Sequence, residues 1–205
     1  MLTFAKPTGR VYLRLGRTGL NSMEFFSFDI PDVRLLRPKR YGDERGWFME
    51  TYRRDLLAAA GVRDDFVQDN QSYSAARGTI RGLHFQRPPH AQAKLIRVLS
   101  GRILDVALDL RRSSPHFGRH VAVELDADGA SLYIPAGFAH GFCTLTDHVS
   151  VAYKASDTYT PEAEGGVAWD DPDLEIAWPV APKDAIVSER DRRLPRLGDL
   201  EPVFP

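Results

Sequence analysis

Hydrophobic and polar residues alternate along much of the second half of the chain. Aliphatic residues occupy every second position from Leu104 to Leu110, and Asp105 and Asp109 fall between them. The same period of two recurs over residues 121–125, 132–134 and 149–153. Because successive side chains of a strand point to opposite faces, this pattern predicts half-buried antiparallel strands whose apolar faces form a core.

Short turn-forming stretches separate these strands, among them LSGR, RRSSPHFG, DADG and PAGFAHG. Such a series of short strands is typical of an all-β sandwich or closed barrel, and not of a βαβ sheet. A short helix is predicted over residues 53–61, where Leu56 and Ala60 fall on one face. We therefore expect an all-β domain with a few short helices.

The chain has 205 residues and a mass of 23.0 kDa, which fits one domain with a substantial core. Residues 1–22 show no clear period, whereas alternation begins at Met23. We expect an N-terminal extension over residues 1–22 and a single domain over residues 23–205. The tail from Pro179 is rich in proline and charge, which predicts an irregular segment that wraps over the core.

Charge and composition exclude several classes of partner. The 27 Lys and Arg residues against 28 Asp and Glu leave a net charge of −1, which gives no overall attraction to nucleic acid or to an acidic membrane. No apolar run approaches the roughly 18 residues of a membrane span. Cys143 is the only cysteine, and no signal-peptide pattern is found at the start. These features predict a cytoplasmic protein with a small-molecule partner.

Titratable residues are concentrated in RGLHFQRPPHAQAK, residues 81–94. Gly82 permits a β-bulge, and a bulge would bring Arg81 and His84 into one pocket although strict alternation separates them. The alternative for His84 is a hydrogen-bonded core histidine. Lys94 is in phase with Ile96, which points it inward, unless it lies at the strand end and extends to water.

A second cluster, LYIPAGFAHGFCTL, contains the pattern P-x-G-x-x-H, which ends at His140. This pattern resembles the second motif of the cupins, which are small β-barrels with an internal pocket. The H-x-H of metal-binding cupins occurs nowhere in the chain. His84, His90 and His140 with a carboxylate leave a metal site as an alternative, but we expect a barrel without a metal.

Longer motifs extend this resemblance over residues 25–196. They are DERGWFMETY, FVQDNQSYS, RGLHFQRPPHAQAKLIRVLSGRILDVALDLR, IPAGFAHGF, AYKASDTYTPEAEGGVAWDDPDLEIAWP and SERDRRLPRL. In this order they resemble the dTDP-4-dehydrorhamnose 3,5-epimerases. The resemblance implies a cupin-like jelly-roll barrel (double-stranded β-helix). It also implies a cofactor-independent isomerase that converts dTDP-4-dehydro-6-deoxy-D-glucose to dTDP-4-dehydro-L-rhamnose in dTDP-rhamnose biosynthesis.

The resemblance implies three catalytic roles that suit the chemistry of such an epimerase. His84 matches the base that removes the acidic proton next to the ketone. Lys94 matches the cation beside the C4 oxygen, where negative charge develops. Tyr153 matches the acid that returns a proton from the opposite face, and its phase with Val149 and Val151 independently points it inward. A buried core tyrosine is the alternative for Tyr153.

A histidine base works better with a carboxylate that fixes its tautomer. The family motif S-x-K/R-D-x-x-x-P matches SERDRRLP and so implies Asp191 as the partner of His84. Asp184 in PKDA ranks second, because it lacks the serine before it and the proline after it. An oxygen of Asp191 is expected within about 3.2 Å of a ring nitrogen of His84.

The resemblance also implies residues that bind the dTDP-sugar substrate. These are Arg45, Glu50, Gln68, Asn70, Arg81, His140 and Glu164. The chain departs from the family where two adjacent aromatic residues are usual, since Thr158 precedes Tyr159 here. The family is usually a homodimer with exchanged N-terminal strands, and the strand-like EFFSFDI is a candidate for pairing with a second copy.

Two other functions fit the same residues. One is a relative that epimerises C3 or C5 alone, because the same base and cation serve either carbon. The other is a cupin that binds a sugar nucleotide without catalysis, since a fold does not establish an activity.

Overall fold

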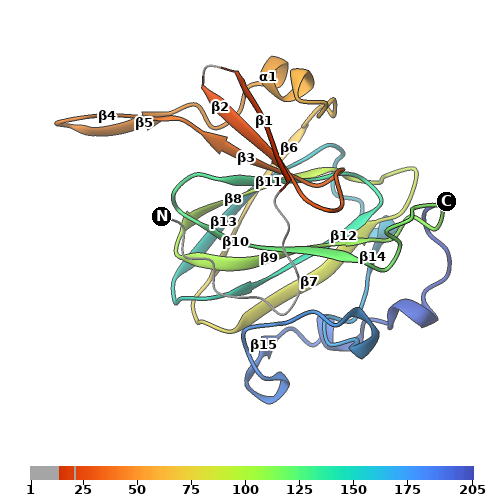
Figure 1. The fold of residues 1–205 in the computed structure, drawn as a ribbon. Coiled ribbons are helices and arrows are strands. Elements are labelled where there is room, and N and C mark those ends of the chain that lie inside the picture. Colours follow the sequence, from red (N-terminus) through yellow and green to blue (C-terminus); the bar gives the residue numbers. More distant parts are fainter. Residues whose placement is uncertain (1–13, 21) are drawn as a thin grey trace.

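The computed structural model of the chain describes residues 14–20 and 22–205. Two antiparallel sheets face one another as a jelly-roll barrel, and the few helices are short and lie outside it (Figure 1). This architecture confirms the all-β barrel predicted from the alternating pattern. No helix in the described part of the chain has the length and apolar character needed to span a membrane.

The larger sheet has seven strands in the order β1-β2-β3-β11-β8-β13-β6. Its strands are β1 Arg14–Leu20, β2 Met23–Ser27, β3 Arg34–Pro38, β11 Ser131–Ile134, β8 Lys94–Ser100, β13 Val149–Ala155 and β6 Gln68–Ser74. The smaller sheet has the order β10-β9-β12-β7-β14, and β15 pairs with β7 in parallel. Its strands are β10 His120–Asp126, β9 Arg102–Asp109, β12 Phe138–Thr144, β7 Thr79–Gln86, β14 Glu164–Gly166 and β15 Ile186–Val187.

A separate hairpin, β4 Arg40–Asp43 and β5 Gly46–Met49, extends away from the barrel (Figure 1). The predicted helix is present as α1 Arg54–Ala59, which buries Leu56 and Leu57. The remaining helices are single 3₁₀ turns: η1 Pro161–Ala163, η2 Pro172–Leu174, η3 Pro182–Asp184, η4 Asp191–Arg193 and η5 Leu197–Asp199.

The N-terminal strands differ from the sequence prediction. β1 pairs with β2, in a register that places Leu20 opposite Met23, so the sheet begins before the boundary expected at Met23. Residues 1–13 of the expected extension lie outside the described residues. β2 lies between β1 and β3, and EFFSFDI is therefore not a free edge as expected. The edge strand at this end of the sheet is β1.

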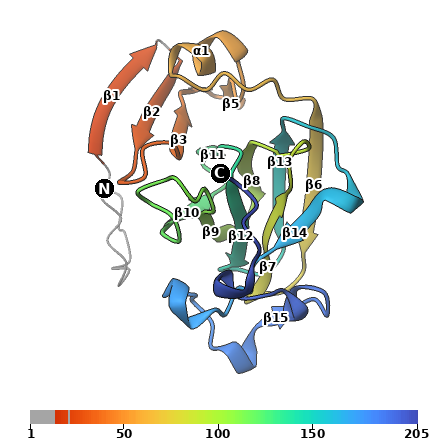
Figure 2. The same ribbon diagram turned by 90° about the vertical axis from the view of Figure 1, so that its right-hand side faces the viewer.

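Strand β9 is buried on both faces, and the expectation of a half-buried strand there is wrong. Its leucines and Val106 pack against apolar residues that follow β14, including Leu174 and, in the C-terminal tail, Phe204. The alternate face, which carries Asp105, lines the barrel interior with Ile103 and Ala107. These residues supply the second cover of β9, which the sequence pattern could not reveal. The part of the tail around β15 lies below β7 in both views (Figures 1 and 2).

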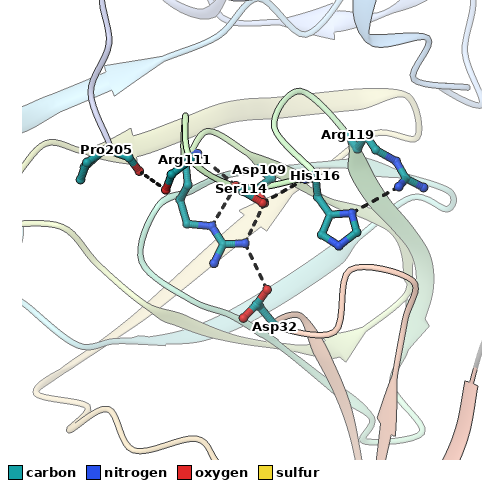
Figure 3. A network of polar contacts seen from close by, with 8 residues as sticks. Asp32, Asp109, Arg111, Ser114, His116, Arg119 and Pro205 are labelled. Atoms are coloured by element: carbon teal, nitrogen blue, oxygen red, sulfur yellow. Dashed lines mark hydrogen bonds and ion pairs between the residues drawn. The ribbon is translucent and has the colours of Figure 1, made fainter.

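A polar network at the end of β9 connects this strand with the loop that follows it and with the β2–β3 connection (Figure 3). The fully buried Asp109 accepts hydrogen bonds from Arg111 at 2.7 and 2.9 Å and from the Ser114 hydroxyl at 2.7 Å. Arg111 also reaches Asp32, at 3.1 Å, in the connection between β2 and β3. The network therefore ties the N-terminal strands to the barrel.

Replacing Arg111 with alanine should lower the free energy of unfolding by roughly 3 kcal/mol, because it leaves the buried Asp109 carboxylate without its counter-charge. Urea denaturation measures this change. The exposed Arg63 provides a control, since Arg63→Ala should change stability by less than about 0.5 kcal/mol. Equal stability of the two variants would contradict this role for the network.

Candidate active site

Polar side chains replace apolar ones on the strand faces that line one part of the barrel interior. Lys94 is in phase with the core residues Ile96 and Val98, and His140 lies between Phe138 and Phe142. The same alternation directs three further polar side chains inward. We call the resulting set the interior cluster, which consists of His84, Lys94, Asp105, His140 and Tyr153. Both sheets contribute to this cluster.

Gly82 forms the predicted bulge in β7. His140 pairs with His84 but Phe142 pairs with Arg81, so β7 contains one extra residue. Gly82 has φ of +118°, and a Cβ there would lie 2.6 Å from the Cα of Gly141. Only glycine fits this conformation and close approach. Arg81 lies just before the bulge and donates to the Ser74 hydroxyl and the Tyr73 carbonyl, at 3.1 and 2.9 Å.

His84 and Asp191 form the expected pair. Nε2 of His84 lies 2.8 Å from Oδ1 of Asp191, and the Gly82 amide donates to Oδ2 at 3.1 Å. Burial opposes the charged form of Asp191, but hydrogen bonds from His84, Gly82 and Ser188 lower the pKa of its carboxyl. Asp184 lies in the exposed turn η3. The expected contact with Asp191 is thus confirmed, and the second-ranked Asp184 does not make it.

Lys94 begins β8 and is directed into the barrel. Its ammonium group donates a long hydrogen bond of 3.4 Å to the His84 carbonyl. Burial lowers the pKa of Lys94 to about 8, although the negative charges of Glu164 and Asp105 oppose the change. A lysine in this environment gives up its proton near pH 8 and is a strong electrostatic partner while it is charged.

Tyr153 reaches the interior from the sheet opposite His84. Burial raises the pKa of its hydroxyl, as does the charge of Glu164, whereas Arg81 lowers it. The hydroxyl therefore carries its proton at neutral pH. The half-buried Asn70 pairs with Tyr153 across β6 and β13 and accepts a hydrogen bond from Gln68 at 2.9 Å.

Glu164 lies at the same end of the barrel and holds two further side chains. It accepts a hydrogen bond from the Tyr159 hydroxyl at 2.5 Å and pairs with Arg190 at 2.6 Å. Burial disfavours its charged form, but these two partners lower the pKa of its carboxyl. The Tyr159 amide donates to Gln68, which connects this group to Asn70 and Tyr153.

Comparison with known proteins identifies the family. The family model described as dTDP-4-dehydrorhamnose 3,5-epimerase matches residues 27–199. The chain belongs to this epimerase family. It is 44% identical over 191 residues to dTDP-4-dehydrorhamnose 3,5-epimerase of Sinorhizobium fredii, covering 93% of this chain and 97% of the relative.

Solved structures of the epimerase family share the fold. The enzyme of Bacillus anthracis with TDP and PPi bound has a TM-score of 0.82 and 48% identity, over 85% of this chain and 99% of that one. The dTDP-6-deoxy-D-glucose-3,5-epimerase of Legionella pneumophila in complex with dTDP-4-keto-L-rhamnose has a TM-score of 0.83 and 39% identity. That match covers 87% of this chain and 95% of the other.

Two of the residues expected to bind the substrate, Arg45 and Glu50, lie outside the interior cluster. Arg45 is at the turn of the β4–β5 hairpin, where it pairs with Asp43 at 2.5 Å. Glu50 follows the hairpin and accepts a hydrogen bond from Ser22 at 3.1 Å. The hairpin extends away from the barrel (Figure 1), so one chain does not bring Arg45 to the interior cluster.

The three histidines considered as metal ligands have separate carboxylate partners. His90 lies 3.2 Å from Asp157 in a loop. His84 pairs with Asp191, as described, and His140 lies 2.5 Å from the buried Asp105. Within the described ranges no group of three or more His, Cys, Asp and Glu residues has the arrangement of a metal site.

The sequence prediction of site residues does not include Asp105, which belongs to the interior cluster. The signal was present, because Asp105 alternates with aliphatic residues in a strand. The alternation alone assigns Asp105 to a solvent-facing side of the strand, whereas that side lines the barrel interior. Knowing that the tail covers β9 would have identified Asp105 as a buried charge.

Proposed function

We propose that the protein inverts C3 and C5 of dTDP-4-dehydro-6-deoxy-D-glucose and so produces dTDP-4-dehydro-L-rhamnose, a step in dTDP-rhamnose biosynthesis. The observation that carries the proposal is the placement of a histidine–carboxylate pair, His84–Asp191, opposite Tyr153 across the barrel interior. Lys94 lies beside His84. A base and an acid on opposite sides of a ring are what inversion at a carbon requires.

His84 acts as the base in this proposal. With Nε2 donating to Asp191, Nδ1 is free to take the proton from the carbon next to the C4 ketone. The electrons of the broken C–H bond form a C–C double bond, and the carbonyl electrons move to the C4 oxygen. The negative charge of Asp191 stabilises the imidazolium that results.

Lys94 stabilises the enolate, and Tyr153 completes the inversion. The ammonium group of Lys94 faces the negative charge that develops on the C4 oxygen. Tyr153 then gives its proton to the carbon from the opposite face and regains one from solvent, while the His84 imidazolium releases its proton to solvent. Repeating the two transfers at the second carbon inverts both. Each inversion leaves the oxidation state of the sugar unchanged, so we expect the reaction to need neither nicotinamide nor a metal.

Residues around the cluster bind the substrate in this proposal. Arg81 supplies a cation for the diphosphate, while Gln68, Asn70, His140 and Glu164 supply donors and acceptors for the sugar and the base. The nucleotides bound in the related Bacillus and Legionella structures support a dTDP-sugar as the ligand. A nucleotide-sugar substrate and a single, buried cysteine support a cytoplasmic location.

Lys94 should set the alkaline limit of catalysis. Its pKa of about 8 means that the stabilising charge is present below this pH and is lost as the pH rises through it. Above this pH, kcat/KM should fall about tenfold per unit. Steady-state rates between about pH 6 and pH 10 measure the profile. A profile without a decline over this range would show that the charge of Lys94 is not needed.

A homodimer is part of the proposal, because Arg45 lies on a hairpin that leaves the barrel. The hairpin exposes Trp47 and Phe48 by 56% and 70%, which is unusual for large aromatic side chains. Packing the hairpin on a second copy would cover them and carry Arg45 to the partner's site. Light scattering at micromolar concentration should give about twice the 23.0 kDa of one chain. A mass of one chain would contradict the dimer.

Product formation tests the proposed function. The protein is incubated with dTDP-4-dehydro-6-deoxy-D-glucose and a chelator, without nicotinamide, and proton NMR follows the sugar. Conversion to the L-rhamno product supports the proposal. Inversion of one carbon alone would select the single-carbon epimerase, and binding of dTDP without conversion would select the non-catalytic cupin.

A further inference from the structure

Asp105 is a buried acidic residue that has no role in the proposed reaction. It lies in the middle of β9 on the face that carries the core residues Ile103 and Ala107, and it is 0% exposed. An aspartate at such a position requires partners for both oxygens, because a buried charge without them is strongly disfavoured. The contacts of the two carboxylate oxygens therefore indicate the role of Asp105.

Only one of its oxygens has a partner among the described residues. Oδ1 lies 2.5 Å from Nε2 of His140, which is itself buried. Oδ2 is buried and accepts no hydrogen bond from any side chain or amide that the structure describes. A buried carboxylate oxygen of this kind is satisfied by a nearby cation or by a bound molecule.

Lys94 is the cation that suits this oxygen. Its ammonium group has three protons to donate. The hydrogen bond that the structure gives it is the 3.4 Å contact with the His84 carbonyl. Asp105 and Glu164 are the two carboxylates whose negative charges act on it. The ammonium therefore has unused donors, and a carboxylate of the same interior cluster has an unused acceptor.

The other carboxylates of the site already have strong partners. Glu164 pairs with Arg190 at 2.6 Å and accepts from the Tyr159 hydroxyl. Asp191 accepts from His84 and from the Gly82 amide. Glu164 has the larger effect on Lys94 of the two carboxylates that act on it, but its charge is shared with its two partners. Asp105 is bound by His140 alone, through one oxygen.

We propose that Asp105 is a positioning residue of the epimerase, which orients His140 through Oδ1 and favours the charged state of the Lys94 ammonium through the negative charge of its unpaired second oxygen. The functional part of this inference rests on the proposed function. The groups that face Lys94 are then Asp105 from β9, Glu164 from β14, His84 from β7, His140 from β12 and Tyr153 from β13. Loss of the Asp105 charge should make Lys94 neutral at a lower pH.

The direct test follows Lys94 itself. In protein labelled with ¹⁵N-lysine, NMR gives the titration of each side-chain nitrogen, and Lys94→Ala assigns the resonance. Asp105→Asn keeps the shape of the side chain and should move the Lys94 midpoint down by about 1 pH unit. Asp69→Asn is the matched control, because it removes the partner of Lys154, 2.8 Å away, and should leave Lys94 unchanged.

The pattern of results separates a positioning role from a merely structural one. If Asp105 acts on Lys94, the alkaline limb of kcat/KM for Asp105→Asn moves down with the NMR midpoint, while dTDP affinity changes less than about threefold. A uniform loss of activity with an unmoved Lys94 midpoint would overturn the proposal. The NMR result does not depend on turnover, so it tests Asp105 even if the proposed reaction fails.

The wild-type protein provides a second measurement in case Asp105→Asn does not fold. With ¹³C-aspartate labelling, the side-chain carbon of Asp105 should have the chemical shift of a carboxylate at neutral pH. A protonated carboxyl there would overturn the proposal, because a neutral group cannot serve as the counter-charge of Lys94.

Discussion

Replacing His84 with alanine should reduce turnover by about 10³-fold or more while dTDP binding changes little. The side chain is the base of the proposed reaction, and the interior cluster of described residues holds one other imidazole, His140, which is committed to the buried Asp105. Alanine also leaves Asp191 without its ring partner. Initial rates with saturating substrate, together with calorimetric titration of dTDP, measure the two effects.

His90 provides the control for this substitution. It lies in a loop and faces Asp157, so His90→Ala removes an imidazole without touching the interior cluster. Turnover should stay within about threefold of the wild type. If His84→Ala kept a tenth or more of wild-type turnover, another group would be the base.

The Asp191→Asn substitution should lower turnover by about 10² or more with a small change in KM. Asparagine keeps most of the shape but removes the charge that stabilises the imidazolium, and it can hold the ring in the wrong tautomer. The effect should appear in kcat, because Asp191 contacts His84 and the Gly82 amide and acts through the ring. Steady-state kinetics over a range of substrate concentrations separate kcat from KM.

Asp184→Asn is the matched control, since Asp184 lies in an exposed turn of the same tail. It should leave both constants unchanged. A large loss from Asp184→Asn, or a rise in KM alone from Asp191→Asn, would contradict the assigned partner of His84.

The sequence predicts the strands and the inward direction of the main site residues well, because the period of two is local information. Lys94 and Tyr153 are in phase with core valines and isoleucines and are directed inward as expected. The bulge at Gly82 was also predictable, since a glycine inside a strand pattern commonly marks one. The motif predicts Asp191 as the partner of His84, although the two residues are 107 positions apart in the chain.

The features that the sequence does not reveal are those set by packing between segments that are far apart in the chain. Alternation in β9 indicates two faces but not that the C-terminal tail packs on one of them, and so Asp105 was assigned to solvent. Likewise, nothing local shows that β1 pairs along β2, or that Arg45 lies on a hairpin that leaves the barrel. These features are set by contacts between distant segments, and in the case of Arg45 by contacts that we assign to a second copy.

Hydrogen exchange at the two reacting carbons tests the central claim most directly. The protein is incubated with dTDP-4-dehydro-6-deoxy-D-glucose in deuterated water, without metal or nicotinamide, and proton NMR follows the signals of C3 and C5. Abstraction by His84 and return of a solvent-derived proton through Tyr153 should replace both hydrogens with deuterium. Retention of hydrogen at both carbons, in a folded protein that binds dTDP, would contradict the account.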